Sequence, residues 1–195
     1  MNRKSILTLA IALVVVVLAA QSASAYVLLS PRRTWASTPV NVPVYQVGNS
    51  TITDGDGGVT AVVGAIQAWG MVSSNSTSQA AVRGQAPATI MLNTNGRICT
   101  GSCLAATLTG YYSGSTIYDA DVYTNTKYKF YSSREADGCS SEFDIDGIMV
   151  HEVGHVIGIG HTTVAGATMY PSVSACNAGN RTLEADDIAA KNDLY

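Results

Sequence analysis

Eleven consecutive residues near the carboxyl end of this 195-residue chain read His151-Glu152-Val153-Gly154-His155-Val156-Ile157-Gly158-Ile159-Gly160-His161. They include all three histidines of the sequence. Two histidines four residues apart project from one face of an α-helix, because four residues make a little more than one turn of about 3.6 residues. His151 and His155 can therefore reach one metal ion. Glu152 leans toward the same pocket without itself being needed as a ligand.

His161 can join this site only if the helix ends soon after His155. A continuous helix turns by about 100° per residue and would carry His161 to the wrong side. Gly158 stands where a residue with positive φ would end the helix, and Gly160 adds freedom to the same bend. Any one of these histidines alone would be an ordinary surface or core residue. Together, three neutral imidazoles leave one tetrahedral position open for water, which is typical of a catalytic zinc site.

The rest of the chain predicts an α+β fold in one compact domain. Hydrophobic periodicity and capping signals predict helices over residues 59–69, 144–157 and 182–194, the second capped by Asp144 and ended by Gly158. Strands are predicted over residues 40–45, 89–92, 104–112 and 117–124. Pro43 favours an edge position for the first strand, because proline cannot donate a ladder hydrogen bond.

Residues 1–25 predict a secretory signal peptide. Arg3 and Lys4 form a short positive region, residues 6–20 carry no charge, and residues 23–25 are small enough for a cleavage site. An uncleaved anchor helix is the alternative, but the apolar run is shorter than the roughly 20 residues that span a bilayer. We therefore expect a secreted protein, extracellular or periplasmic, whose mature chain begins near Tyr26.

Four cysteines, an even number, favour disulfides in a chain that leaves the reducing cytosol. Three pairings are possible. The close spacing of Cys99 and Cys103 favours a local bridge, with a second bridge between Cys139 and Cys176. A cysteine-based metal site is the alternative, but the sequence has no CxxC pair and no spare histidine for one.

The charge balance argues against two classes of partner. The sequence has 11 Lys and Arg against 14 Asp and Glu, and loss of Arg3 and Lys4 with the signal peptide leaves 9 − 14 = −5. A mildly acidic protein lacks the positive surface that binds nucleic acid or anionic membranes. We expect neither partner after signal removal, and a monomer. Residues 54–58 carry part of a calcium-loop pattern, but a solvated turn is favoured because the distal glutamate is missing.

Residues beyond the histidines carry a family resemblance. Residues 151–161 fit the metzincin pattern H-E-x-x-H-x-x-G-x-x-H, and Met169 follows eight residues later. Residues 167–171, Ala-Thr-Met-Tyr-Pro, are similar to the Met-turn of the matrixins, and residues 183–188 with Leu194-Tyr195 are similar to their C-terminal helix. The chain thus resembles the matrixins over most of residues 35–195, most strongly from Asp144 onward.

The resemblance implies a metzincin-like α+β fold. Its parts would be a twisted, mainly parallel five-stranded sheet, three helices, an active-site helix ending at a glycine, a Met-turn and a C-terminal helix. An extended peptide would add to the edge strand as a further strand, and residues 104–108 are the candidate edge. Residues 171–173 would line the pocket for the side chain just after the scissile bond. Asp186 and Asp187 would be structural acceptors, one of them supporting the Met-turn.

The resemblance also implies the site residues. His151, His155 and His161 would bind one catalytic zinc ion, Glu152 would be the general base, and Met169 would lie under the metal. The chain lacks the additional histidines for the structural zinc of animal matrixins, so any structural ion would be calcium held by carboxylates and carbonyls. The usual latency device is missing, because there is no room for a prodomain between Tyr26 and the first strand, and no cysteine there.

These expectations imply a secreted zinc metalloendopeptidase whose catalytic domain spans residues 26–195. It would hydrolyse peptide bonds of a peptide or protein substrate with zinc-activated water and Glu152 as general base. The alternative is a secreted binding or adhesion module that keeps the fold and the zinc but does not turn over peptides. Glu152 argues against that alternative, because a purely structural site has no use for a carboxylate beside the water.

Overall fold

The computed structural model of the chain describes residues 25–36, 41–47, 59–76, 90–93, 98–132 and 139–195. The predicted signal peptide, except for Ala25, and the loop of residues 54–58 lie outside the described residues. A structural calcium ion therefore stays a prediction. Within the described ranges, no helix has both the length and the apolar character needed to cross a bilayer.

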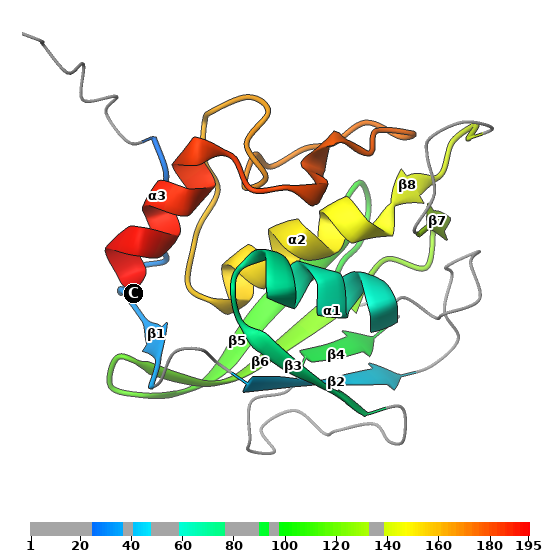
Figure 1. Cartoon of the computed structure of the whole chain (residues 1–195). Coiled ribbons are helices and arrows are strands. Elements are labelled where there is room, and N and C mark those ends of the chain that lie inside the picture. Colours follow the sequence, from blue (N-terminus) through cyan, green and yellow to red (C-terminus); the bar gives the residue numbers. More distant parts are fainter. Residues whose placement is uncertain (1–24, 37–40, 48–58, 77–89, 94–97, 133–138) are drawn as a thin grey trace, which may run out of the picture.

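Helices and strands combine in an α+β arrangement (Figure 1). In the described part of the chain the α-helices are α1 (Val59–Ala68), α2 (Ile145–Val156) and α3 (Ala185–Leu194), with a 3-10 helix η1 (Gly179–Arg181). The strands are β1 (Thr34–Trp35), β2 (Asn41–Val47), β3 (Val72–Ser76), β4 (Ile90–Asn93), β5 (Ala105–Ser113), β6 (Thr116–Thr124), β7 (Phe130–Tyr131) and β8 (Phe143–Asp144). Strands β7 and β8 form a separate parallel pair.

The main sheet is mostly parallel and ends in an antiparallel edge. Its strand order is β1-β6-β4-β2-β3, all paired in parallel, and β5 pairs with β6 in antiparallel register. The expected count of five strands is not confirmed, because the described strands of this sheet number six. Strand β1 is only two residues long, and β3 reads Val-Ser-Ser-Asn-Ser, so neither carries a hydrophobic alternation that sequence analysis could detect.

The prediction that Pro43 places its strand at an edge is wrong. Strand β2 lies inside the sheet, between β3 and β4. Pro43 pairs with Ser74 of β3, whereas pairing with β4 begins only at the next residue, Val44. The missing N–H therefore lies in the first part of β2, where β3 is the single paired neighbour among the described strands, and the sheet accommodates it there.

The predicted edge at residues 104–108 is confirmed. Among the described strands, β5 pairs with β6 alone, through a hairpin that turns at Gly114, where φ is +60°. Both predicted disulfides are also present, Cys99–Cys103 just before β5 and Cys139–Cys176 between the approach to β8 and the loop before η1. The first disulfide holds the start of the edge strand. The second joins two loops that are 37 residues apart in sequence.

Helices α1 and α2 lie side by side over one face of the sheet (Figure 1). The core between these layers contains Ile66, Trp69, Met149 and Val153, all fully buried. The buried indole of Trp69 donates a hydrogen bond to the Val150 carbonyl at 2.7 Å. A buried polar group normally finds such a partner, and this bond also fixes the position of α2 above the sheet.

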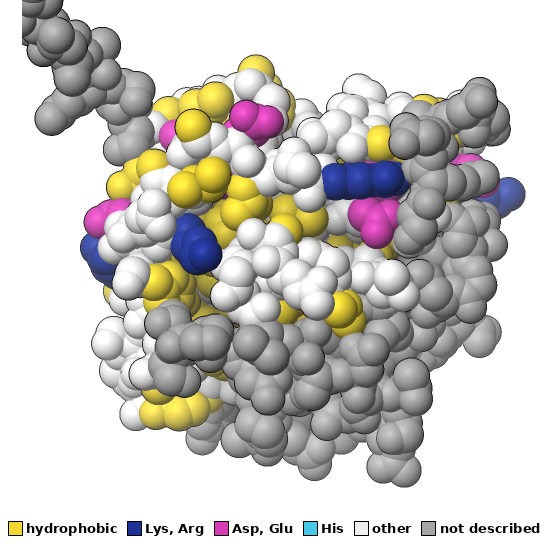
Figure 2. Space-filling view, viewed as in Figure 1, with side chains coloured by type: hydrophobic (Ala, Val, Ile, Leu, Met, Phe, Trp, Pro, Cys, Tyr) yellow, Lys and Arg dark blue, Asp and Glu magenta, His cyan; other side chains and the backbone are white. Residues whose placement is uncertain are grey.

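The charged side chains are few on the face shown in Figure 2, where apolar and uncharged groups cover most of the described surface. This matches a sequence in which only 13% of residues are charged. Five large apolar side chains are exposed among the described residues: Val27, Tyr118, Val164, Ile188 and Tyr195. Isolated exposures of this kind are normal on a soluble domain surface.

The end of α2 follows the sequence prediction. Asp144 caps its start by accepting a hydrogen bond from the Gly147 N–H, and Gly158 follows the helix with φ of +104°. The turn after Gly158 is paired with the N-terminal segment: the Leu29 N–H donates to the Gly158 carbonyl, and the Gly160 N–H donates to the Val27 carbonyl. The segment that brings His161 back is thus fixed by a short antiparallel bridge.

Gly158→Val should damage this bend. A β-branched residue at positive φ costs about 1–3 kcal/mol, and its Cβ would also lie 2.5 Å from the backbone oxygen of Arg33. We expect a lower midpoint of urea unfolding and a loss of bound zinc, with far-ultraviolet circular dichroism showing that α2 persists.

Gly64→Ala is the matched control, because Gly64 lies inside α1 and no atom would lie within 4 Å of the added Cβ. It should be neutral or stabilising by up to about 1 kcal/mol. Gly160→Ala should lie between the two, since its Cβ would be 3.0 Å from the Val27 oxygen. Wild-type zinc content and stability in Gly158→Val would show that the bend does not need positive φ.

Candidate metal centre

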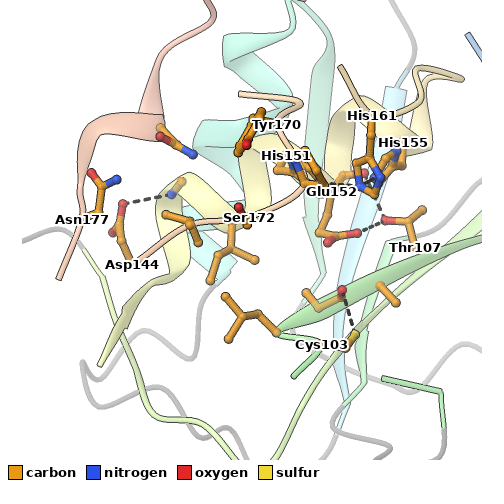
Figure 3. A pocket seen from close by; sticks show the side chains of 18 of the residues that line it. Cys103, Thr107, Asp144, His151, Glu152, His155, His161, Tyr170, Ser172 and Asn177 are labelled. Atoms are coloured by element: carbon orange, nitrogen blue, oxygen red, sulfur yellow. Dashed lines mark hydrogen bonds between the residues drawn. The ribbon is translucent and has the colours of Figure 1, made fainter. Parts of the chain in front are cut away.

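The three histidines converge on one point. His151 and His155 lie one turn apart on α2, and His161 reaches the same face from the loop beyond Gly158. Nε2 of His161 lies 3.2 Å from Nε2 of His155 and 3.2 Å from Nε2 of His151. Figure 3 shows the three rings gathered above Glu152 and Thr107. Among the described residues they form one group able to hold a metal ion.

Backbone carbonyls orient two of the imidazoles. Nδ1 of His151 lies 2.7 Å from the Thr168 carbonyl oxygen, and Nδ1 of His155 lies 2.7 Å from the Ile159 carbonyl oxygen. A carbonyl only accepts, so each Nδ1 carries the proton and donates it. The lone pair is then on Nε2, the atom that faces the centre. Such hydrogen bonds to the second ring nitrogen are the usual way in which proteins orient metal-binding histidines.

The spacing of the donors fits a tetrahedral metal ion. Zinc–nitrogen distances of about 2.0–2.1 Å place tetrahedral ligand atoms about 3.3 Å apart, close to the 3.2 Å that separates Nε2 of His161 from Nε2 of His151 and of His155. Lone pairs that face one another at this distance repel unless a cation lies among them. Three nitrogen donors with one open position match a zinc site that also binds water.

Burial keeps the donors in the neutral form. Desolvation lowers the pKa of His151 to about 4 and the pKa of His155 to about 4, and it also lowers the pKa of the more exposed His161. All three rings are therefore unprotonated near pH 7. Because a protonated imidazole cannot bind a metal, the surroundings of these rings favour metal binding in neutral solution.

Glu152 is buried beside the histidines, with 4% of its surface exposed. Burial raises the pKa of its carboxyl group, while His151 in its protonated form and a hydrogen bond from Thr107 act in the opposite direction. The carboxylate points toward β5, where the Thr107 hydroxyl meets it (Figure 3). A carboxyl group with a raised pKa close to a metal site is suited to accept and return a proton.

Met169 packs against α2, while its place under a bound metal stays a prediction. Its sulfur packs against Gly154, where even a Cβ would lie 2.2 Å from the Met169 sulfur and 2.9 Å from the Trp69 ring. Gly154 is therefore a position of close approach between α2, α1 and the Met-turn. The fully buried Met169 and Gly154 together set how near the turn lies to the helix that carries His151 and His155.

The fully buried carboxylate of Asp187 holds the Met-turn in place. It accepts hydrogen bonds from the backbone N–H groups of Thr168 at 2.8 Å and Met169 at 3.0 Å, and from that of Glu184 at 2.9 Å. Thr168 in turn supplies the carbonyl that orients His151. The expectation that one of the two aspartates supports the Met-turn is confirmed, and the other, Asp186, accepts from the Ala25 N–H.

A bond between Asp187 and Glu184 also explains where α3 begins. Their side chains and backbone groups form a capping box with Glu184 as the N-cap, so the helix starts at Ala185 and not at residue 182. The bonds to Thr168 and Met169 are tertiary and have no local sequence signal.

A cavity of about 580 Å³ opens beside the histidines. The edge strand forms one wall with residues 104–107, α2 forms the floor, and the loop after the Met-turn forms the opposite wall with Tyr170–Val173. Residues 171–173 therefore line a cavity, and their contact with the side chain just after the scissile bond stays a prediction. Asn177 and Asn180 line its far end, which sequence analysis did not identify.

Asp144, which also lines this cavity, forms an ion pair with Arg181. Arg181 donates to both carboxylate oxygens of Asp144, from Nε at 2.9 Å and from Nη2 at 2.8 Å. Paired bonds of this kind are geometrically specific and strong. Asp144 therefore has two roles. It caps the start of α2, and its ion pair joins the segment before α3 to the start of α2.

Sequence comparison adds an independent finding. The profile of the Matrixin family (Peptidase_M10) matches residues 48–195. Curated relatives include Metalloendoproteinase 5-MMP of Arabidopsis thaliana, 41% identical over 54 residues, which are 27% of this chain and 14% of the relative. Metalloendoproteinase 1 of Glycine max is 39% identical over 56 residues, 29% of this chain and 18% of the relative. Matrilysin of Rattus norvegicus is 36% identical over 59 residues, 30% of this chain and 22% of the relative.

The matches to these relatives are short. They span between 14% and 22% of the length of the three relatives just named. The family profile, by contrast, covers the helix with the histidines, the Met-turn and α3 together.

Asp187→Asn should loosen the Met-turn. An amide offers one acceptor oxygen and turns an NH₂ group toward backbone N–H donors, so at least one buried N–H loses its partner. We expect the free energy of unfolding to fall by about 3 kcal/mol in urea titrations of the chelated protein, and zinc affinity to fall as well.

Asp193→Asn, the same change on the exposed side of α3, is the control and should stay within about 0.5 kcal/mol of wild type. If the urea midpoint of unfolding of Asp187→Asn equals that of wild type, the carboxylate does not stabilise the Met-turn.

Proposed function

The chain belongs to the matrixin family, and from that premise we propose that it is a secreted zinc-dependent endopeptidase. Family membership supports metallopeptidase chemistry in general. The curated relatives named as metalloendoproteinases point the same way, although each matches over only part of its length. The finer assignments rest on the geometry of this chain.

One arrangement carries the proposal: three Nε2 atoms face one point, and a buried carboxylate stands beside them next to an exposed strand edge. We assign His151, His155 and His161 as the zinc ligands. A zinc ion held there would lower the pKa of water toward neutrality and would polarise a carbonyl group. A closed structural site would have four protein ligands, whereas here three nitrogen donors leave room for water and substrate.

Glu152 is the general base in this proposal. Its carboxylate accepts a proton from the attacking water and later gives that proton to the leaving amine, so no covalent bond forms between enzyme and substrate. Burial, which raises the pKa of Glu152, brings the group nearer to the pH at which both transfers are efficient. His151 and His155 keep their orientation because Thr168 and Ile159 hold their Nδ1 protons.

The edge strand β5 provides a binding site for a peptide. An extended substrate can pair with the side of β5 that faces away from β6 as a further strand, which places its backbone along the cavity past Glu152. The side chain after the scissile bond then enters the space between α2 and residues 171–173. The substrate is accordingly a peptide or protein in extended form.

The competing function is a zinc-containing binding or adhesion module that has no turnover. It would use the same three histidines and the same strand edge, so zinc content alone does not separate the two. A buried Glu152 with a raised pKa favours the enzyme, because burying an acid costs free energy that a binding module would not need to spend.

Glu152→Gln separates these functions. The amide keeps the size of the side chain but cannot take up a proton, so we expect cleavage of a diverse peptide library to fall by about 10²-fold or more while zinc stays at one ion per chain. Steady-state cleavage and metal analysis measure the two effects.

Glu142→Gln, the same change just before β8, is the matched control and should cleave as wild type does. Wild-type protein with full zinc and no cleavage of any peptide would favour the binding module. Near wild-type turnover in Glu152→Gln would exclude Glu152 as the base.

The amino-terminal sequence of the recovered protein tests whether it is secreted. Protein recovered outside the cytoplasm should begin at Tyr26, because the small residues 23–25 precede it. Val15→Arg, which places a charge in the apolar run, should keep the precursor inside the cell. Recovery of a membrane-bound chain with residues 1–25 intact would support the anchor helix instead.

A further inference from the structure

Thr107 joins the edge strand to the buried acid. It lies on β5, next to Ala106 and opposite Val122 of β6, and its hydroxyl is directed at α2. The hydroxyl oxygen is 2.6 Å from Oε2 of Glu152 and 3.1 Å from the backbone oxygen of the same residue. Figure 3 shows this contact among the side chains that line the cavity.

The two distances show where the Thr107 proton goes. A hydroxyl has one proton to donate, and the two Glu152 oxygens are both acceptors. A separation of 2.6 Å is typical of a hydroxyl donating to a carboxylate, whereas 3.1 Å lies beyond the usual range for such a donor. The strong bond is therefore the one to Oε2.

We propose that Thr107 is a positioning residue for Glu152: its hydroxyl holds Oε2, so that Oε1 is the carboxylate oxygen left to exchange the proton. The inference rests on the proposed function and deepens it. In each turnover a proton passes from water to Oε1 and then to the amine nitrogen that leaves, while the hydrogen bond on Oε2 stays in place.

The contact between Thr107 and Glu152 has a second consequence, because Thr107 lies on β5. The backbone of β5 is where an extended substrate would pair, and Thr107 belongs to the same strand. Thr107 thus links the position of the bound peptide on β5 to the orientation of the Glu152 carboxylate. A carboxylate without this donor could rotate about its last side-chain bond, because terminal carboxylate torsions are broad.

A merely structural role is the rival explanation. Thr107 could simply tie β5 to α2 through the Glu152 backbone oxygen, 3.1 Å away. In that case loss of the hydroxyl would shift the strand, which would weaken substrate binding and lower stability. Loss of positioning would instead slow the chemical step and leave binding unchanged.

Thr107→Val and Thr107→Ser separate these roles. Valine keeps the shape of the side chain without the hydroxyl, and serine keeps the hydroxyl. We expect Thr107→Val to lower kcat about tenfold or more with KM and zinc content unchanged, and Thr107→Ser to restore most of kcat. Thr116→Val is the control for a lost hydroxyl, because Thr116 is six residues along β6 from the partner of Thr107, roughly 20 Å away.

A second readout does not depend on turnover. The chain has four glutamates, so the side-chain ¹³C carboxyl resonance of Glu152 can be assigned by its disappearance in Glu152→Gln. In the chelated protein at one pH, Thr107→Val should move this resonance, whereas Thr107→Ser and Thr116→Val should leave it in place.

The outcomes are distinct. A raised KM with unchanged kcat, an unmoved carboxyl resonance, or a serine variant as slow as the valine variant would each overturn the positioning role. If wild-type protein cleaves no peptide, the proposed function fails, and the carboxyl resonance still decides whether Thr107 holds Glu152.

Discussion

The return of His161 to the face of α2 that carries His151 and His155 is the constraint on which the rest of the site depends. A helix alone offers two donors on one face, and the third must come back from beyond the helix end. Gly158 allows this with φ of +104°, and hydrogen bonds from Leu29 and to Val27 hold the returning loop. The metal centre is therefore built jointly by α2 and by a segment more than a hundred residues earlier in the chain.

A second requirement is electrostatic. In the proposed reaction three imidazoles stay neutral next to an acid that exchanges protons. Burial favours both conditions, since it lowers the pKa of His151 and His155 and raises that of Glu152. Such a group of buried polar side chains needs fixed partners. They are backbone carbonyls for the imidazoles and a hydroxyl from the edge strand for the carboxylate. The scaffold thus orients its donors before any ligand binds.

The Met-turn and the edge strand are held from opposite sides of α2. Asp187 of α3 fixes the turn through backbone N–H groups, and the Cys99–Cys103 disulfide holds the start of β5. Between them, Gly154 lets Met169 approach the helix to a distance that no side chain would permit. The cavity is therefore bounded by elements whose positions are set by buried contacts and not by the flexibility of loops.

Local signals in the sequence determined a large part of this protein. The spacing of the three histidines, the cap at Asp144, the bend at Gly158 and the cysteine spacing all act over short distances, and the structure has the helix, the bend and both disulfides. Tertiary structure alone decided that β2 is an interior strand, that two strands without alternation join the sheet, and that Thr107 meets Glu152 across 45 residues of sequence. Periodicity reports which residues one element buries, but the partner that each buried group meets depends on how separate elements dock, and that choice is made by packing over the whole domain.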